Sequence, residues 1–223
     1  MRIRRKKHLD ERLQAVGEYL IKSDRDIPNV LEAVKDKKYL DFHVLFGNDN
    51  PVCLEIGCGK GGFIIETALK NPNINYIAVE MIENIVVMAC EKAMELNVPN
   101  VKFFNAACEY LPRYIKEEAI SEIYLNFSPP YPQSPYENRR LTCDRFLQNY
   151  KSMLIDGGAV YQRTDDKNFF DYSLTRFIQN GFRVTDTTLM HAAGDEYVFT
   201  EYEKKFLAKG LPIYSLKACK EKG

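Results

Sequence analysis

A glycine-rich segment between two apolar stretches contains the residues with the clearest chemical potential in this chain. Val52 to Ile56 precede it, the segment itself is Gly57-Cys58-Gly59-Lys60-Gly61-Gly62, and Tyr76 to Glu80 form a second apolar stretch that ends in an acid. Glycines allow a backbone to approach a ligand closely because they have no Cβ. At the C-terminal ends of parallel strands, such a turn typically holds a nucleoside-bearing cofactor.

Glu55 distinguishes between the two kinds of cofactor that could use this turn. The pattern Gly57-x-Gly59-x-x-Gly62 fits a dinucleotide fingerprint, with Glu80 near the expected ribose-binding acid. However, a carboxylate at position 55 would oppose a pyrophosphate in a low-dielectric cleft. S-adenosylmethionine carries an ammonium and a sulfonium and no phosphate, so we predict this cofactor rather than a nicotinamide or a flavin. A turn with no ligand is the structural alternative, and Lys60 is not followed by the Ser or Thr of a phosphate-binding P-loop.

A second candidate segment follows a predicted strand at 122–127 and has four prolines within residues 128–135. Proline at this density disfavours both a helix and a central strand. A long loop at the C-terminal end of a parallel strand is a common place for catalytic residues. Arg139 and Arg140 come soon after this loop, and they are the best candidates for contacts with a polyanion. Alternatively, one of the two could hold the loop by pairing with a neighbouring acid.

Strand-like and helix-like segments alternate along the rest of the chain. The predicted strands are 52–56, 75–80, 101–106, 122–127, 159–163, 182–189 and a last one near 197–200. The predicted helices are 10–22, 62–69, 82–96, 111–118, 142–154 with Thr142 as its N-cap, and 167–179 with a C-cap at Asn180-Gly181. This alternation predicts an α/β fold with a doubly wound, right-handed parallel sheet. We divide the chain into an N-terminal basic arm with a helical extension, 1–50, and one domain, 51–223.

The composition limits the classes of protein to which this chain can belong. With 223 residues, 45% hydrophobic content and no apolar run of transmembrane length, we expect a cytoplasmic protein with a full core. The formal net charge is zero, so a nucleic-acid surface must come from local clusters such as Arg2 to Lys7. That cluster fits a nucleic-acid arm and a solvated chain end equally well. Six cysteines without a CxxC pair and three scattered histidines argue against a metal site and disulfides, and Cys53, Cys90 and Cys108 are expected as buried thiols.

Several motifs together resemble the bacterial tRNA (guanine-N7)-methyltransferase family. They are Leu54 to Phe63, Ile123-Tyr-Leu-Asn126-Phe-Ser128, Arg139-Arg140-Leu141-Thr142, Thr164-Asp165-Asp166, Thr200 to Phe206 and Gly210-Leu-Pro212-Ile-Tyr214. The glycine turn is shared by many methyltransferases, whereas the arginine pair and the Thr-Glu-Tyr-Glu string are much more specific. The resemblance covers nearly the whole chain. It implies methyl transfer from S-adenosylmethionine to N7 of guanine at variable-loop position 46 of tRNA, on a Rossmann-like, seven-stranded sheet with a reversed last strand.

The resemblance also implies roles for individual residues. It assigns Glu55 to the ammonium group of the cofactor and Glu80 to its ribose. The other implied cofactor-binding residues lie around the turn and the adenine: Gly57, Gly59, Met81, Asn105, Ala106, Ala107 and Asn126. Substrate binding falls on the proline loop, the arginine pair and two C-terminal motifs: Gln133, Arg139, Arg140, Asp165, Thr200, Glu201, Tyr202 and Glu203. Two of these have structural alternatives, because the segment around Asp165 could cap a helix and Tyr202 could simply pack on Phe206.

The proline loop and its surroundings depart from the family pattern at three positions. The family usually has an Asp, a Lys and a further acid where this chain has Pro129, Gln133 and Ala107. The catalytic assignment therefore stays open among the loop residues Asn126, Ser128, Pro129, Pro130 and Tyr131. Guanine N7 has an in-plane lone pair and no proton to lose, so alignment of the reacting atoms could suffice without a general base. We expect reduced or retuned activity, with Asp165, Glu201 or Glu203 as candidate replacements for the carboxylate.

Three other functions fit part of the pattern. Ser128-Pro129-Pro130-Tyr131 matches the motif of methyltransferases that act on exocyclic amino groups of nucleic-acid bases. A cofactor-binding RNA module with weakened catalysis would fit the substitution at Pro129. A small-molecule methyltransferase is disfavoured by the two basic clusters. For partners, we expect tRNA, no membrane and no metal, in a monomer or a homodimer.

Overall fold

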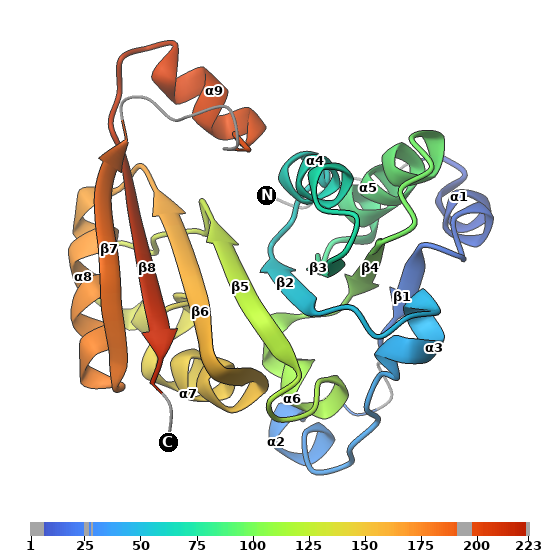
Figure 1. Cartoon of the computed structure of the whole chain (residues 1–223), viewed down its shortest axis with the longest axis horizontal. Helices are drawn as coiled ribbons and strands as arrows, with labels where there is room; N and C mark the ends of the chain where they lie inside the picture. Colours follow the sequence, from blue (N-terminus) through green and yellow to red (C-terminus); the bar gives the residue numbers. More distant parts are fainter. Residues whose placement is uncertain (1–6, 25–26, 28, 191–197, 222–223) are drawn as a thin grey trace. The chain divides into compact units, whose positions relative to one another are not determined.

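The computed structural model describes residues 7–24, 27, 29–190 and 198–221, in which helices and strands alternate (Figure 1). The chain forms two compact units, Met1–Ile115 and Lys116–Gly223. Each unit has its own set of strands and helices, and each contains part of the residues that the sequence singles out. The boundary predicted at residues 50 and 51 stays a prediction.

The first unit is built on four parallel strands in the order β1-β4-β3-β2. They are β1 (Leu20–Lys22), β2 (Val52–Ile56), β3 (Asn75–Val79) and β4 (Val101–Asn105). Every residue of β2 and β3 is buried, as expected for parallel strands that are covered on both faces. The helical segments of this unit are α1 (Leu9–Ala15), α2 (Val30–Ala33), α3 (Phe42–Phe46), α4 (Gly62–Lys70), α5 (Glu83–Glu95), η1 (Cys108–Tyr110) and α6 (Leu111–Tyr114).

The segment before β2 differs from the prediction of one helix at 10–22. Helix α1 ends at Ala15, and Leu20–Lys22 then pairs with Phe103, Phe104 and Asn105 of β4 as an additional edge strand. The helix is anchored by Arg12, whose guanidinium donates two hydrogen bonds to the carboxylate of Glu91 on α5, at 2.6 and 2.5 Å. Because β4 and Glu91 are distant from this segment in the sequence, local periodicity could not indicate where the helix ends.

The second unit has four strands in the order β5-β6-β8-β7. Strand β6 (Leu154–Thr164) is parallel to β5 (Ile120–Asn126), and β8 (Ile213–Lys220) is antiparallel both to β6 and to β7 (Phe182–Met190). Strand β8 is therefore the reversed last strand that the family resemblance implies. Helices α7 (Asp144–Met153) and α8 (Lys167–Gln179) lie on the same face of these strands (Figure 1). The remaining helical segments are η2 (Ser134–Arg139) and α9 (Glu201–Leu207).

Three predictions in or beside the second unit are wrong in detail. The last strand was expected near 197–200; residue 197 lies outside the described residues, and 198–200 form no strand but lead into α9. Thr142 does not cap α7: Cys143 is the N-cap, and the Thr142 hydroxyl instead lies 2.8 Å from the Ser173 hydroxyl. The helix predicted at 111–118 ends at Tyr114, just before the second unit begins. The other predicted strands and helices of the chain are present, with ends that differ by a few residues.

The cysteines and the helices give two further findings. Cys53, Cys90 and Cys108 are buried as predicted, and all six cysteines are free thiols. Among the described residues, no helix combines the length and the apolar character that a membrane span needs, and no group of acids, histidines and cysteines has the arrangement of a metal site.

Gly61 provides a test of the packing at the start of α4. It is the N-cap of this helix with φ +75°, and an added Cβ would lie 3.0 Å from Ala89 Cβ and 3.0 Å from Ile65 Cδ1. We predict that Gly61→Ala lowers the free energy of unfolding by about 2–4 kcal/mol, as the sum of overpacking and a left-handed backbone. Gly47→Ala is the control, because φ is +69° there but no atom lies within 4 Å, so that only about 1–2 kcal/mol is expected. Urea denaturation measures both variants, and equal losses would contradict this account of the packing.

Candidate active site

The glycine turn joins β2 to α4 in an unusual backbone conformation. Gly57, Gly59 and Gly61 all have positive φ, at 81°, 56° and 75°. The amides of Gly57 and Cys58 both donate to the carbonyl oxygen of Val79, at 2.8 and 3.0 Å, so the turn is tied to the end of β3. A Cβ added at Gly57 or Gly59 would meet no described atom within 4 Å. The backbone at these two glycines is therefore open to the close approach of a ligand.

Two buried acids stand beside this turn at the C-terminal ends of neighbouring strands. Glu55 lies in β2, paired with Ala78 of β3, and Glu80 directly follows β3; their exposed fractions are 2% and 9%. The Glu80 carboxylate accepts a hydrogen bond from the amide of Ile82 at 2.9 Å. Burial raises the pKa of Glu80, and the backbone N–H groups of Ile82, Gly59 and Met81 oppose the rise. Glu80 thus places a buried carboxylate beside the glycine turn and contacts the residue that precedes α5.

Cys58 lies in the turn, near both acids. Its thiol is buried, and its pKa is raised well above the ordinary value, first by burial and then by the charges of Glu55 and Glu80. The two carboxylates themselves disfavour a pyrophosphate and favour a cation. The turn therefore fits the ammonium and sulfonium of S-adenosylmethionine better than a dinucleotide.

The end of β4 completes the predicted cofactor residues of the first unit. The Asn105 side chain is buried and donates to the backbone carbonyl of Glu80 at 2.9 Å, which links the ends of β3 and β4. Ala106 is buried, Ala107 is half-buried, and Met81 has 63% of its surface exposed. An exposed apolar side chain beside small residues can flank a flat adenine ring. The three strand ends therefore bring together Glu55, Gly57, Gly59, Glu80, Met81, Asn105, Ala106 and Ala107.

In the second unit, the loop after β5 begins with strained backbone. Asn126 ends β5, and the next residue, Phe127, has φ +50°; Tyr131 has φ +40°. Left-handed conformations of bulky residues cost about 1–3 kcal/mol each and persist only where the surroundings hold them. Ser128 is buried, and its hydroxyl oxygen has no hydrogen-bond partner among the described residues, whereas Pro129 is exposed. Strain and an unsatisfied buried hydroxyl are features of functional loops rather than of efficient packing.

The two arginines after this loop have different environments. The Arg140 guanidinium donates to the carbonyl oxygens of Pro130 and Tyr131, at 2.9 and 3.0 Å, and lies 4.2 Å from the centre of the Tyr172 ring. Arg139 is exposed and lies over Tyr136 at 4.7 Å. Gln133, the N-cap of η2, is exposed too. The alternative that one arginine of the pair holds the loop therefore fits Arg140, whose loop partners are backbone carbonyls rather than an acid.

The Thr200 to Glu203 motif forms the start of α9. The Thr200 hydroxyl accepts from the amide of Glu203 at 3.0 Å, and the Glu203 carboxylate accepts from the amide of Thr200 at 2.6 Å, which is a capping box. The Glu203 side chain is buried and forms a 3.4 Å ion pair with Arg163 of β6. Both side chains therefore have structural partners, and the S/T-x-x-E spacing could have indicated this cap from the sequence.

The other predicted substrate residues of the second unit are more exposed. Tyr202 has 46% of its surface exposed, and its ring lies 5.0 Å from that of Phe127 and 4.6 Å from that of Phe206. Asp165 is exposed, and its neighbour Asp166 is the residue that caps α8, by accepting from the amide of Phe169 at 2.8 Å. Helix α9 contains Glu201, and residues 2–6 of the basic arm lie outside the described residues.

Sequence reasoning missed two residues that support the loop. The amide of Phe127 donates to the carbonyl of Arg163 at 2.8 Å, and the Phe127 ring contacts Tyr202. Tyr172 supports Arg140 from α8. No local motif marks either residue, because each is defined by a partner that is distant in the sequence.

Comparisons with known proteins agree with this fold. A family model with the description "Putative methyltransferase" matches residues 49–216. The 16S rRNA methyltransferase KamB has a similar structure, with a TM-score of 0.61, 14% identity, and coverage of 82% of this chain and 94% of that one. A 16S rRNA (adenine(1408)-N(1))-methyltransferase from Catenulisporales acidiphilia, solved with its cosubstrate, has a TM-score of 0.58 at 13% identity over 90% of this chain and 93% of that one. The fold and the turn define a Rossmann-like, S-adenosylmethionine-dependent methyltransferase.

Relatives in sequence are similar over nearly the whole chain. A tRNA (guanine-N(7)-)-methyltransferase of Geobacillus sp. (strain WCH70) is 42% identical over 96% of this chain and 93% of the relative. Proteins of the same name from Streptococcus uberis and Listeria monocytogenes serovar 1/2a are 40% and 39% identical, each over 98% of this chain and at least 98% of the relative. This chain belongs to the tRNA (guanine-N7)-methyltransferase family. The fold differs from the implied seven strands by the added strand β1.

The contacts of Glu80 predict the effect of neutralising it. We expect Glu80→Gln to weaken the binding of S-adenosylmethionine by about tenfold to hundredfold, because hydrogen bonds to a charged acceptor contribute about 1.5–3 kcal/mol. Isothermal titration calorimetry measures the affinity. Glu95→Gln makes the same change of charge at an exposed position near the end of α5 and serves as the control. Unchanged cofactor affinity in Glu80→Gln would show that this carboxylate does not organise the cofactor site.

Proposed function

We propose that this protein transfers a methyl group from S-adenosylmethionine to N7 of a guanine in tRNA, at variable-loop position 46. The observation that carries the proposal is the sequence identity of about 40% with tRNA (guanine-N7)-methyltransferases over almost the full length of the chain. The two buried acids beside the glycine turn, Glu55 and Glu80, support the choice of cofactor independently. A cytoplasmic location follows from the proposed substrate, and the choice between monomer and homodimer stays a prediction.

Each residue of the cofactor set has a role in this proposal. S-adenosylmethionine, when bound, supplies a methyl group that is activated by the positive sulfur. Glu55 would pair with the ammonium group, and Glu80 would accept hydrogen bonds from the ribose hydroxyls. Gly57 and Gly59 allow close approach of the backbone, and the remaining residues would surround the adenine or the methionine part: Met81, Asn105, Ala106, Ala107 and Asn126.

The substrate residues have the task of orientation rather than proton transfer. Guanine N7 attacks with a lone pair, so rate depends on holding N7 in line with the methyl carbon and sulfur. The side chain of the exposed Pro129 has no acceptor for the guanine N1–H or amino group. We propose that the exposed residues Asp165, Tyr202, Gln133 and Arg139 contact the RNA. The capping box assigns Thr200 and Glu203 to the placement of α9, which carries Glu201 and Tyr202.

One experiment tests the reaction directly. The protein is incubated with radiolabelled S-adenosylmethionine and unmodified tRNA, and the product is cleaved with aniline, which cuts at N7-methylguanosine. We expect cleavage at position 46, and none in a transcript that has adenine there. Label on an exocyclic amino group would favour the alternative based on Ser128 to Tyr131. Cofactor binding without any methyl transfer would favour a non-catalytic RNA module.

The departure at Pro129 gives a prediction of increased activity. If the missing carboxylate limits the orientation of guanine, Pro129→Asp should raise kcat/KM for tRNA by about tenfold, which corresponds to one hydrogen bond to a charged group. Pro132→Asp adds the same charge at another exposed position of the loop and is the control. Steady-state kinetics compare both variants with the wild type. A Pro129→Asp variant that is no faster than the control would show that other residues already orient the base.

A further inference from the structure

Arg140 is fixed by contacts with the backbone of the loop and with an aromatic ring. Its Nε donates to the carbonyl oxygen of Pro130 at 2.9 Å and its Nη2 to that of Tyr131 at 3.0 Å. Its central carbon lies 4.2 Å from the centre of the Tyr172 ring, within cation–π distance. The planar fork of an arginine suits two neighbouring acceptors, which the point charge of a lysine does not.

The two carbonyl groups that accept from Arg140 flank a strained residue. They precede and follow the Cα of Tyr131, whose φ of +40° is in the left-handed region. A tyrosine adopts this conformation only when its surroundings hold it. The contact with Arg140 is therefore placed where it can keep the loop in this conformation.

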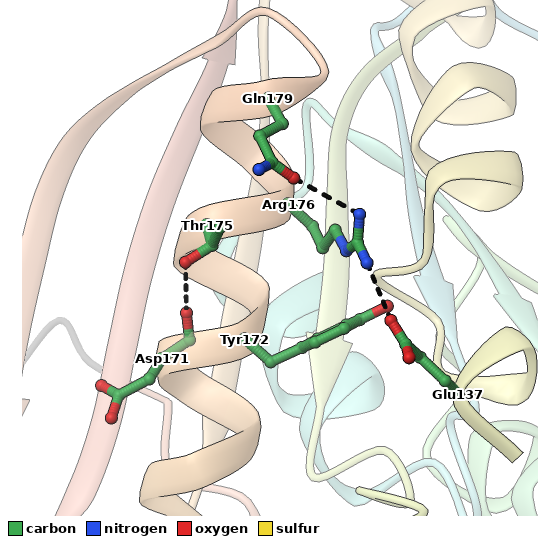
Figure 2. Close-up of a pocket in the computed structure, with 6 residues that line it drawn as sticks. All are labelled: Glu137, Asp171, Tyr172, Thr175, Arg176 and Gln179. Carbon is green, nitrogen blue, oxygen red and sulfur yellow. Dashed lines mark hydrogen bonds and ion pairs between the residues drawn. The ribbon is translucent and has the colours of Figure 1, made fainter. Parts of the chain in front are cut away.

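Residues outside the loop support Arg140 in turn, and Figure 2 shows three of them, Tyr172, Arg176 and Glu137. Tyr172 and Arg176, one turn apart on α8, both extend toward Glu137 of η2. Arg176 donates to the Glu137 carboxylate at 2.8 Å and lies 5.2 Å from the Tyr172 ring. The Arg140 amide donates to the backbone carbonyl of Glu137 at 3.0 Å. Hydrogen bonds from Arg176 and then Tyr172 lower the pKa of Glu137, so this acid is charged at neutral pH.

We propose that Arg140 is a positioning residue for methyl transfer, which holds the loop at Pro130 and Tyr131 and is itself held by Tyr172, Arg176 and Glu137. We call these four side chains the Arg140 clamp. Its neighbour Arg139, which is exposed, is then the arginine of the pair that meets an RNA phosphate. The catalytic part of this proposal rests on the proposed function, whereas the conformational part does not.

The test separates positioning from phosphate binding through kinetics. Arg140→Lys keeps the charge but loses the fork, and Tyr172→Leu removes the ring without touching the loop. Both should lower kcat by about tenfold to hundredfold, as expected for misplaced reacting groups, while KM for tRNA and its salt dependence stay close to wild type. Tyr172→Phe keeps the ring and should recover most of the kcat that Tyr172→Leu loses. Arg139→Gln should instead raise KM for tRNA. It should also reduce, by about one, the slope of the logarithm of tRNA affinity against the logarithm of salt concentration.

A second measurement does not depend on activity. Hydrogen exchange of the segment 127–136 reports the order of the loop in the protein alone, and thermal unfolding shows whether each variant is folded. We expect faster exchange in Arg140→Lys and Tyr172→Leu, and exchange close to wild type in Tyr172→Phe and Arg139→Gln. If Tyr172→Leu does not fold, Arg140→Lys and Tyr172→Phe carry the test.

The results separate the Arg140 clamp from a phosphate contact at Arg140 and from a failure of the proposed function. If the wild type methylates tRNA while Arg140→Lys keeps both kcat and loop exchange, the clamp is wrong. If Arg140→Lys raises KM and flattens the salt dependence with kcat intact, Arg140 is a phosphate contact instead. If the wild type transfers no methyl group but loop exchange rises in Arg140→Lys and Tyr172→Leu, the proposed function and the catalytic role of the clamp fail, and its conformational role stands.

Discussion

The amides of Gly57 and Cys58 both donate to the carbonyl oxygen of Val79, and this contact ties the glycine turn to the end of β3. The same strand end is joined to β4 through the Asn105 side chain, and the Glu80 carboxylate that follows it accepts from the amide of Ile82, just before α5. The turn needs these connections because three of its glycines have positive φ, a conformation that glycine leaves easily. The shape of the proposed cofactor site therefore depends on how the end of β3 is held.

The second unit uses a different means to the same end. Its loop has bulky residues with positive φ, at Phe127 and Tyr131, where the first unit has glycines. Bulky residues rarely adopt this left-handed conformation unless other parts of the protein stabilise it, and here residues that are distant in the sequence do so. Arg163 accepts from the amide of Phe127 and pairs with Glu203, while Arg140 binds the carbonyls around Tyr131. Because this chain has Pro129 and Gln133 where the family usually has an Asp and a Lys, the proposed orientation of a base would depend on this support from behind the loop.

The parts of the structure that the sequence could predict are those with local causes. The strand at 52–56, the turn and the start of α4 at residue 62 were predicted correctly, because apolar runs and glycines define them within a few residues. The short strand β1 was missed because it exists only through pairing with Phe103 and Phe104. The sequence allowed that one arginine of the pair holds the loop, but which of Arg139 and Arg140 does so was out of reach, since it depends on the ring of Tyr172 in another helix. By contrast, the cap at Thr200 could have been predicted, because its spacing to Glu203 is a known local signal.

The raised pKa of Cys58 has a chemical consequence for the proposed cofactor. A methylated sulfonium is an alkylating agent, and a thiolate is among the strongest nucleophiles in proteins. Burial first, and then the charges of Glu55 and Glu80, raise the pKa of this thiol further above neutrality and so suppress its reactive thiolate form. A buried turn flanked by two acids, which suits a cationic methyl donor, thus also disfavours methylation of its own sulfur.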